Sequence, residues 1–197
     1  GVPVAYSIGI STTLTILLNI AFLPGITTVS QRMTTGIDSF SLLAIPFFVL
    51  AGELMNQGGV ANRLINLAKS LVGSLPGGLA YVNTLAAMLF GAISGSAVAA
   101  ASAIGSVMTD RMEDEGYPRP FSAALNITAS TTGLLIPPSN VLIVYALASG
   151  GAASVAALFI AGYVPGLLVG LALMIVAAVI ARKRKFARGE RIKLGQV

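Results

Sequence analysis

Long apolar blocks dominate the chain. Forty consecutive residues, 70–109, carry no charged side chain, and neither do the 62 residues 120–181. Each block exceeds the roughly 20 apolar residues that an α-helix needs to span a bilayer. The blocks are continuous, whereas a transmembrane barrel would show alternating segments of about ten residues. The pattern therefore predicts an integral membrane protein of the all-α class.

Proline and glycine divide these blocks into helices. Spans are expected over residues 2–24 and 39–56, the second with a kink at Pro46. The polar stretch between them, with Arg32 and Asp38, is predicted to be a solvated loop. The predicted regions are scaffold transmembrane helices at 1–56, an amphipathic interfacial arm helix at 57–77, a transport-type region at 78–149, a transmembrane helix at 150–181, and a basic cytoplasmic tail or inter-repeat linker at 182–197.

The arm helix follows from a change of pattern after Gly58 and Gly59. Apolar residues recur there at helical spacing while polar side chains fill the opposite face, which is typical of a helix lying along the membrane interface. The apolar face is predicted to consist of Val60, Leu64, Leu67 and Leu71.

Two interruptions break the transport-type region. The 32 residues 78–109 are too many for one upright helix and too few for two full spans, and Ser94-Gly95-Ser96 lies at their centre. They predict a re-entrant helical hairpin. Residues 120–149 form a second apolar segment, which Pro137 and Pro138 interrupt because proline removes backbone donors and disfavours helix at the preceding residue. They predict a broken transmembrane helix.

Both breaks expose polar backbone groups to an apolar environment, where unsatisfied groups cost free energy. A functional role would account for that cost. The ends of broken helices offer carbonyls, dipoles and hydroxyls that hold a small ion or an anionic substrate. Uncharged oxygen atoms suit a singly charged cation such as sodium, and two glycines allow close approach of backbone. The residues that offer these groups are Ser94, Gly95, Ser96, Thr131, Thr132, Gly133 and Ser139.

Structural interpretations of the same residues stay open. Gly91 and Gly95 form a GxxxG pair that is typical of close helix packing. The Pro137-Pro138 pair is compatible with a simple kink, and membrane hydroxyls commonly bond to their own helix. Under this interpretation the chain is a structural membrane subunit without an ion site of its own.

Composition removes most enzymatic interpretations. The chain has no Cys, His or Trp, so it lacks thiolate chemistry, imidazole bases and the usual zinc ligands. An intramembrane serine hydrolase would need a base, and Lys69 is the only lysine outside the tail. Seven of the twelve Lys and Arg residues lie within 182–193, which indicates a cytoplasmic tail. With a hairpin at 78–109, Arg63 and Arg111 are also cytoplasmic, and Arg32 is periplasmic.

Several longer segments resemble one protein family. They are "DSFSLLAIPFFVLAGELMNQGGVANRLINLA", "GGLAYVN", "GAISGSAVAAASAIGS", "GLLIPPSN" and "LFIAGYVPGLLVGLALM". In this order, over nearly the whole chain, they resemble the large membrane subunit (DctM-like) of tripartite ATP-independent periplasmic (TRAP) transporters. The resemblance is to the N-terminal half: one repeat of an inverted-repeat, elevator-type transporter without its first helix.

The resemblance implies a multi-pass permease of the bacterial inner (cytoplasmic) membrane that is not an enzyme. It implies sodium-coupled symport of organic acids of the C4-dicarboxylate, sugar acid or sialic acid type. The implied partners are a small membrane subunit (DctQ-like) and a periplasmic substrate-binding protein (DctP-like). Sodium is the coupling ion, and no other cofactor is expected.

The family's functional segments map onto both breaks. Ser94-Gly95-Ser96 corresponds to the hairpin tip, with Ser94, Ser96 and Thr132 as expected sodium ligands. Many relatives carry an aspartate where this chain has Ala100. The expected sodium or substrate site comprises Ser94, Gly95, Ser96, Thr131, Thr132, Gly133, Pro137, Pro138, Ser139 and Asn140.

Overall fold

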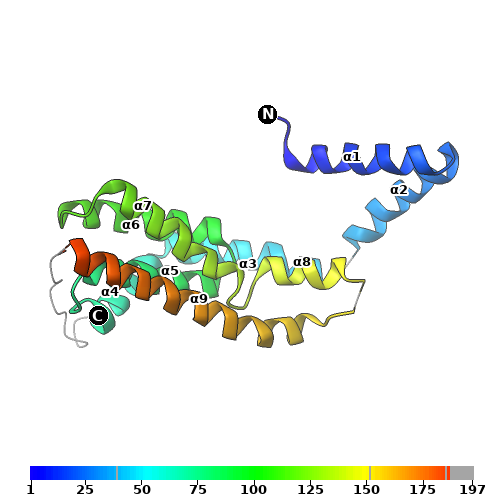
Figure 1. Ribbon diagram of the computed structural model, residues 1–197. Coiled ribbons are helices and arrows are strands. Elements are labelled where there is room, and N and C mark those ends of the chain that lie inside the picture. The colour runs from blue at the N-terminus through cyan, green and yellow to red at the C-terminus, as the bar shows by residue number, and fades with distance from the viewer. Residues whose placement is uncertain (39, 151, 185, 187–197) are drawn as a thin grey trace. The chain divides into compact units, whose positions relative to one another are not determined.

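The computed structural model describes residues 1–38, 40–150, 152–184 and 186. Across these ranges the regular structure is entirely helical, as the all-α prediction requires (Figure 1). The chain divides into two compact units, Gly1–Leu43 and Ala44–Val197. The predicted basic tail lies outside the described residues, except for 182–184 and Phe186.

The first unit holds two helices, α1 (Val4–Asn19) and α2 (Phe22–Ile37). The prediction of a solvated loop around Arg32 was wrong, because α2 continues through it. Pro24 does not end a helix here: it lies in the first turn of α2, where a helix does not need the missing N–H. The α2 threonines return their hydroxyl hydrogens to carbonyls of their own helix, as Thr34 does to Ser30 (2.9 Å).

The second unit includes most of α3 (Phe40–Gln57) and α4 (Val60–Val72). Pro46 lies inside α3. The predicted amphipathic helix α4 is present, but the residues buried in the unit differ from those of the predicted apolar face. Leu71 is 56% exposed, and the buried residues are Ala61, Ile65 and Ala68. Two of these three are alanines, whose small side chains let α4 lie close against α5 (Gly78–Ser94).

The core of this unit is the pair of helices α5 and α6 (Ala97–Asp114), which Gly95 and Ser96 join. The side chains of Phe90, Ile104 and Met108 are at most 2% exposed within it. The prediction that helix stops near Thr109 was wrong, since α6 runs to Asp114. It ends in a Schellman turn, in which Gly116 has a φ of 84° and the Tyr117 N–H donates to the Met112 carbonyl (2.9 Å).

The predicted interruption after residue 120 is present. Helix α7 (Arg119–Ser130) gives way to a short 3-10 helix, η1 (Thr131–Leu134), and helix resumes as α8 (Asn140–Ala148). Residues 135–139, between η1 and α8, include the two prolines, joined by a cis peptide bond. The chain therefore offers two free helix ends inside one apolar segment.

The last helix, α9 (Val155–Arg184), has 30 residues. Within the described residues it is the one helix that is long and apolar enough by itself to cross a bilayer. Gly162, Gly166 and Gly170 are buried along one face, while apolar side chains such as Leu168 stay exposed on the other. The glycine face of α9 packs against η1 and α5 and thereby supports the interrupted segment.

Candidate functional site

The tip between α5 and α6 is a turn built on Gly95, whose φ of 63° is in the left-handed region. Glycine adopts this conformation without steric cost, whereas other residues rarely do. The Gly95 N–H caps α5 by donating to the Gly91 carbonyl (2.8 Å). Ser96 caps the next helix, because its Oγ accepts from the Ala99 N–H (3.3 Å). The C-terminal carbonyls of α5 and the N-terminal N–H groups of α6 are thus separated by only the two residues of this turn.

The tip touches the interrupted helix directly. The Asn140 N–H donates to the Gly95 carbonyl (3.4 Å). A Cβ atom added to Gly95 would lie 2.7 Å from the Pro138 carbonyl oxygen, so only glycine fits against this backbone. One turn back along α5, a Cβ atom on Gly91 would lie 2.6 Å from the Cα atom of Gly133. The structure therefore brings the segments 91–96 and 133–140 into backbone contact.

The break repeats the chemistry of the tip. Ser139 caps α8 as Ser96 caps α6, since its Oγ accepts from the Leu142 N–H (3.4 Å). The Ser139 hydroxyl also donates to the Leu134 carbonyl at the end of η1 (2.6 Å). Two helix N-termini, each with a serine cap, therefore begin on the two sides of this contact. Helix N-termini carry partial positive charge and favour anionic groups.

The threonines of η1 differ in placement. Thr132 is fully buried and donates its hydroxyl hydrogen to the Ala129 carbonyl (2.6 Å). Thr131 is exposed and donates to the Thr128 carbonyl (2.7 Å), so its side chain does not enter the contact. A hydroxyl that gives its hydrogen to backbone keeps both lone pairs available, and buried Thr132 can still act as a ligand.

Two buried oxygen atoms complete the donor set. The Ser94 side chain is 2% exposed, and its Oγ accepts weakly from the Ser96 N–H (3.4 Å). The Asn140 Oδ1 is buried without a hydrogen-bond partner among the described residues. An unpartnered buried polar oxygen costs free energy unless a ligand or water meets it. This oxygen belongs to Asn140, whose backbone N–H contacts the tip.

Other residues at the site serve as its support. Ala100 is fully buried in the α5–α6 core. Gly52 of α3 packs against the tip, because a Cβ atom there would lie 3.1 Å from the Ser94 Cβ. The sequence pattern did not predict this contact. The signal for it is a single glycine inside an apolar helix, which does not reveal its partner.

A polar clamp between α6 and α7 was also not predicted. The buried Asn126 donates its Nδ2 hydrogen to the Ala101 carbonyl (2.8 Å). Gly105 makes room for it, since a Cβ atom there would clash with the Asn126 amide. The clamp fixes the helix after the tip to the helix before the break. The motif "NITAS" gave a hint only in that it places a polar residue inside an apolar segment.

Comparison with known proteins identifies the class. The family described as "Tripartite ATP-independent periplasmic transporter, DctM component" matches residues 1–197. The chain belongs to this family, which consists of membrane-embedded transport proteins and not of enzymes. The resemblance found in the sequence motifs is thereby confirmed.

Individual relatives agree with the family. The chain is 58% identical over 196 residues to the uncharacterized protein YgiK of Salmonella typhimurium strain LT2, covering 100% of the chain and 45% of that protein. It is 47% identical over 189 residues to the C4-dicarboxylate TRAP transporter large permease protein DctM of Pseudomonas aeruginosa, covering 95% and 43%. It is 43% identical over 191 residues to the sialic acid TRAP transporter large permease protein SiaM of Vibrio cholerae, covering 94% and 43%.

The chain spans about half the length of the curated relatives that it matches. The two relatives named for a substrate carry different acids, so similarity to them points to a kind of cargo and not to one compound.

Proposed function

We propose that this chain supplies one half of the transport site of a TRAP large permease, and that the contact between the tip (residues 94–96) and the break (131–140) binds sodium. In the complete permease, sodium binding at this contact is coupled to import of an organic acid. The segment 78–109 is a re-entrant hairpin in this proposal, and the second unit moves as part of an elevator.

The observation that carries the proposal is the backbone contact itself. Gly95 rests on the Pro138 carbonyl, and the Asn140 N–H reaches back to the Gly95 carbonyl. A simple kink in the second segment would not need a second helix pair to end at the same place. Four helix ends that meet without a charged side chain leave carbonyls and hydroxyls whose lost hydration an ion offsets.

The side chains fit a singly charged cation. Ser94, Thr132 and Asn140 offer buried neutral oxygen atoms, and hard cations prefer oxygen ligands. The three belong to α5, η1 and α8, so an ion held by all three would tie the tip to both sides of the break. Ser96 stands beside them as the α6 cap.

The polarity of the helix ends indicates the chemical class of the cargo. The N-termini of α6 and α8, with their serine caps, favour a carboxylate close to the bound cation. The names of these relatives support an organic acid of the C4-dicarboxylate or sialic acid type. A periplasmic binding protein would deliver the acid, and a small membrane subunit would brace the scaffold, as in a three-part transporter.

The membrane arrangement is part of the proposal. The permease crosses the bacterial inner membrane several times, with Arg63 and Arg111 cytoplasmic and Arg32 periplasmic, as the positive-inside rule favours. Cysteine variants at positions 63 and 111 in this cysteine-free chain are expected to react with the same impermeant reagent from the same side. Labelling of the two positions from opposite sides would rule out the re-entrant hairpin.

The function is tested with the complete transporter and its binding protein in proteoliposomes. Uptake of a C4-dicarboxylate and of sialic acid is measured with an inward sodium gradient and with potassium in its place. We expect uptake of one acid with sodium only, and no uptake without the binding protein. Equal uptake in potassium would contradict sodium coupling, and no uptake of either acid would contradict the cargo class.

A further inference from the structure

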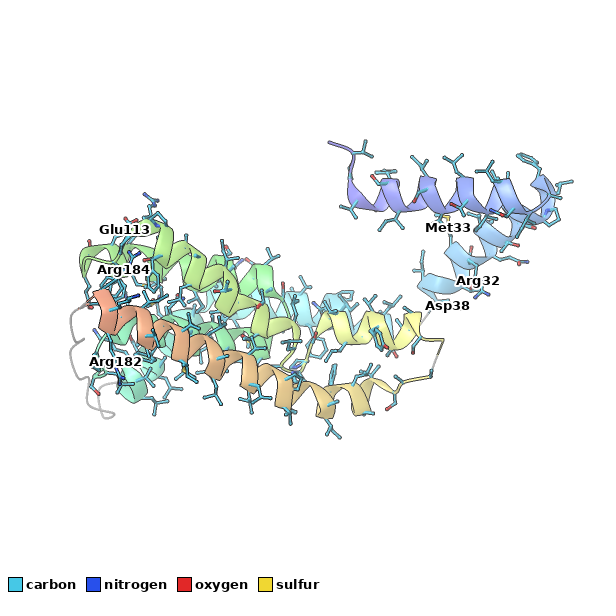
Figure 2. The ribbon with its side chains drawn as sticks, viewed as in Figure 1. Arg32, Met33, Asp38, Glu113, Arg182 and Arg184 are labelled. Atoms are coloured by element: carbon cyan, nitrogen blue, oxygen red, sulfur yellow. The ribbon has the colours of Figure 1, made fainter. Side chains whose placement is uncertain are left out.

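A second polar site lies at the opposite end of the hairpin from the tip. A cavity of about 230 Å³ opens between α4, the start of α5 and the end of α6. Its base is apolar and buried, formed by Ile65, Leu79 and Val82. Four charged side chains line it, two of each sign: Lys69, Arg111, Asp114 and Glu115. Figure 2 labels Glu113, Arg182 and Arg184 at this same end of the second unit.

The position of these charges places the cavity at the edge of the apolar layer. Lys69 is the last charged residue before the uncharged stretch 70–109, and Arg111 follows that stretch by two residues. Because both ends of this stretch meet at one cavity, we expect its rim to lie at the depth of lipid head groups. Lys69 also belongs to α4, the most amphipathic element of the second unit, which the sequence predicts to lie along the interface.

Within the described residues, the four charged side chains of the cavity form no ion pair with one another. Among residues 1–38, 40–150, 152–184 and 186, no N···O distance of 4.0 Å or less joins any two of them. The neighbouring pair Arg119–Glu113 does form an ion pair (3.2 Å) and does not line the cavity. Two cations and two carboxylates around one apolar base have no net charge, so they match a zwitterion better than an anion.

We propose that this cavity binds the head group of a zwitterionic phospholipid that carries a primary ammonium, which is phosphatidylethanolamine chemistry. Lys69 and Arg111 face the phosphodiester, whereas Asp114 and Glu115 accept hydrogen bonds from the ammonium. The apolar base receives the carbon atoms between the two charges. The lipid would hold the arm helix α4 against the hairpin ends without a covalent link.

Lipid retention tests the proposal independently of transport. The intact permease is stripped of lipid, exposed to equal amounts of phosphatidylethanolamine, phosphatidylcholine and phosphatidylglycerol, and examined by native mass spectrometry. We expect preferential retention of phosphatidylethanolamine. Phosphatidylcholine is the sharper comparison, because it keeps the phosphate and the net charge but its methylated ammonium cannot donate a hydrogen bond.

Charge variants assign the roles. D114N/E115Q is expected to remove the preference for phosphatidylethanolamine over phosphatidylcholine. K69Q and R111Q are each expected to lower retention of both zwitterionic lipids about fivefold, the effect of about 1 kcal/mol for one basic residue near a membrane surface. R63Q and E113Q remove charges of α4 and α6 that do not line the cavity, and should retain lipid as the parent does.

Three results would overturn the proposal. The first is equal retention of the three lipids by the parent, and the second is unchanged selectivity in D114N/E115Q with a native circular dichroism spectrum. The third is displacement of the lipid by soluble glycerophosphoethanolamine at equal concentration, which would show a site for a soluble zwitterion instead. Since retention does not depend on sodium or cargo, a failure here would leave the transport proposal standing, and the reverse also holds.

Discussion

Helix α6 is preceded and followed by a turn that contains a glycine with positive φ, but the two turns are built differently. Gly95 has a φ of 63° and lies against the Pro138 carbonyl, with no charged residue nearby in the sequence. Gly116 has a φ of 84°, and a Cβ atom there would meet nothing within 4 Å. Charged residues precede it, and the buried Tyr117 follows. The first turn is shaped by what it touches, and the second by its own local hydrogen bonds.

This difference separates a turn that only reverses the chain from one that serves a site. A Schellman turn such as that at Gly116 is complete in itself. The turn at Gly95 leaves polar backbone in an apolar region and satisfies part of it through a segment 45 residues later, at Asn140. Function is therefore expected to be sensitive at Gly95 and tolerant at Gly116.

Replacing each glycine by valine gives the largest expected effect. G95V adds strain at a positive φ and also drives a branched side chain into the Pro138 carbonyl, so the tip must leave the break. We expect sodium-dependent uptake by the complete transporter to fall more than about 100-fold, equivalent to more than about 2.7 kcal/mol. G116V should cost only the conformational strain of about 1–3 kcal/mol in stability, with uptake per folded molecule retained. Similar uptake losses per folded molecule in both variants would remove the distinction between the turns.

Two asparagines extend the comparison along α5 and α8. Asn140 lies at the break with a buried, unpartnered Oδ1, and Asn83 is a fully buried amide of α5 that also lacks side-chain partners among the described residues. Asn83 is 11 residues before Ser94, or about 16 Å along the helix. N140A is expected to weaken sodium affinity about 5- to 150-fold, the range for loss of one ligand at 1–3 kcal/mol.

The control variant N83A should leave sodium affinity within about twofold of the parent, because it removes the same chemical group far from the contact. Both affinities can be measured by calorimetric titration of the purified permease. An equal loss in N83A would show that the sodium effect is a general consequence of disturbing a buried amide.

The turn between α5 and α6 and the interruption between α7 and α8 could be predicted from sequence because glycine, serine and proline occurred where an apolar run penalises them. The contact between Gly95 and Pro138 could not be derived from local pattern, since it depends on how two distant segments pack. The prediction of a loop around Arg32 was wrong for a local reason: threonines that bond to their own helix make a polar segment compatible with helix. The buried face of α4 was missed because alanine gives a weak hydrophobic signal although it permits the closest packing.

The smallest expected effect concerns the charged end. Burial, together with the nearby Glu115 carboxylate, raises the pKa of Tyr117 to about 12. Its hydroxyl lies by the first backbone amides of α5, at Leu79 and Ala80, and its ring packs against Phe121 and Phe186. Folding favours the neutral phenol, which therefore contributes to the free energy of unfolding. This contribution is complete below about pH 10, the usual pKa of tyrosine, and is lost as pH rises toward about 12.

Y117F is therefore expected to match the parent within about 0.5 kcal/mol at pH 7, since the hydroxyl has no hydrogen bond of good geometry to lose. Between pH 10 and 12 the parent should lose thermal stability more steeply than Y117F does. Thermal unfolding in detergent across this range measures the difference. Parallel curves for the two proteins would mean that Tyr117 titrates alike in the folded and unfolded states.

The central claim is that the tip and the break hold one ion together, and a double-mutant cycle on sodium affinity tests it most directly. Sodium dissociation constants are measured for the parent, S94A, N140A and S94A/N140A in the complete permease. Two ligands of one ion are expected to show a coupling free energy of at least about 0.5 kcal/mol. Additive effects within about 0.3 kcal/mol, or titration curves for all four proteins that coincide, would contradict a shared sodium site at this contact.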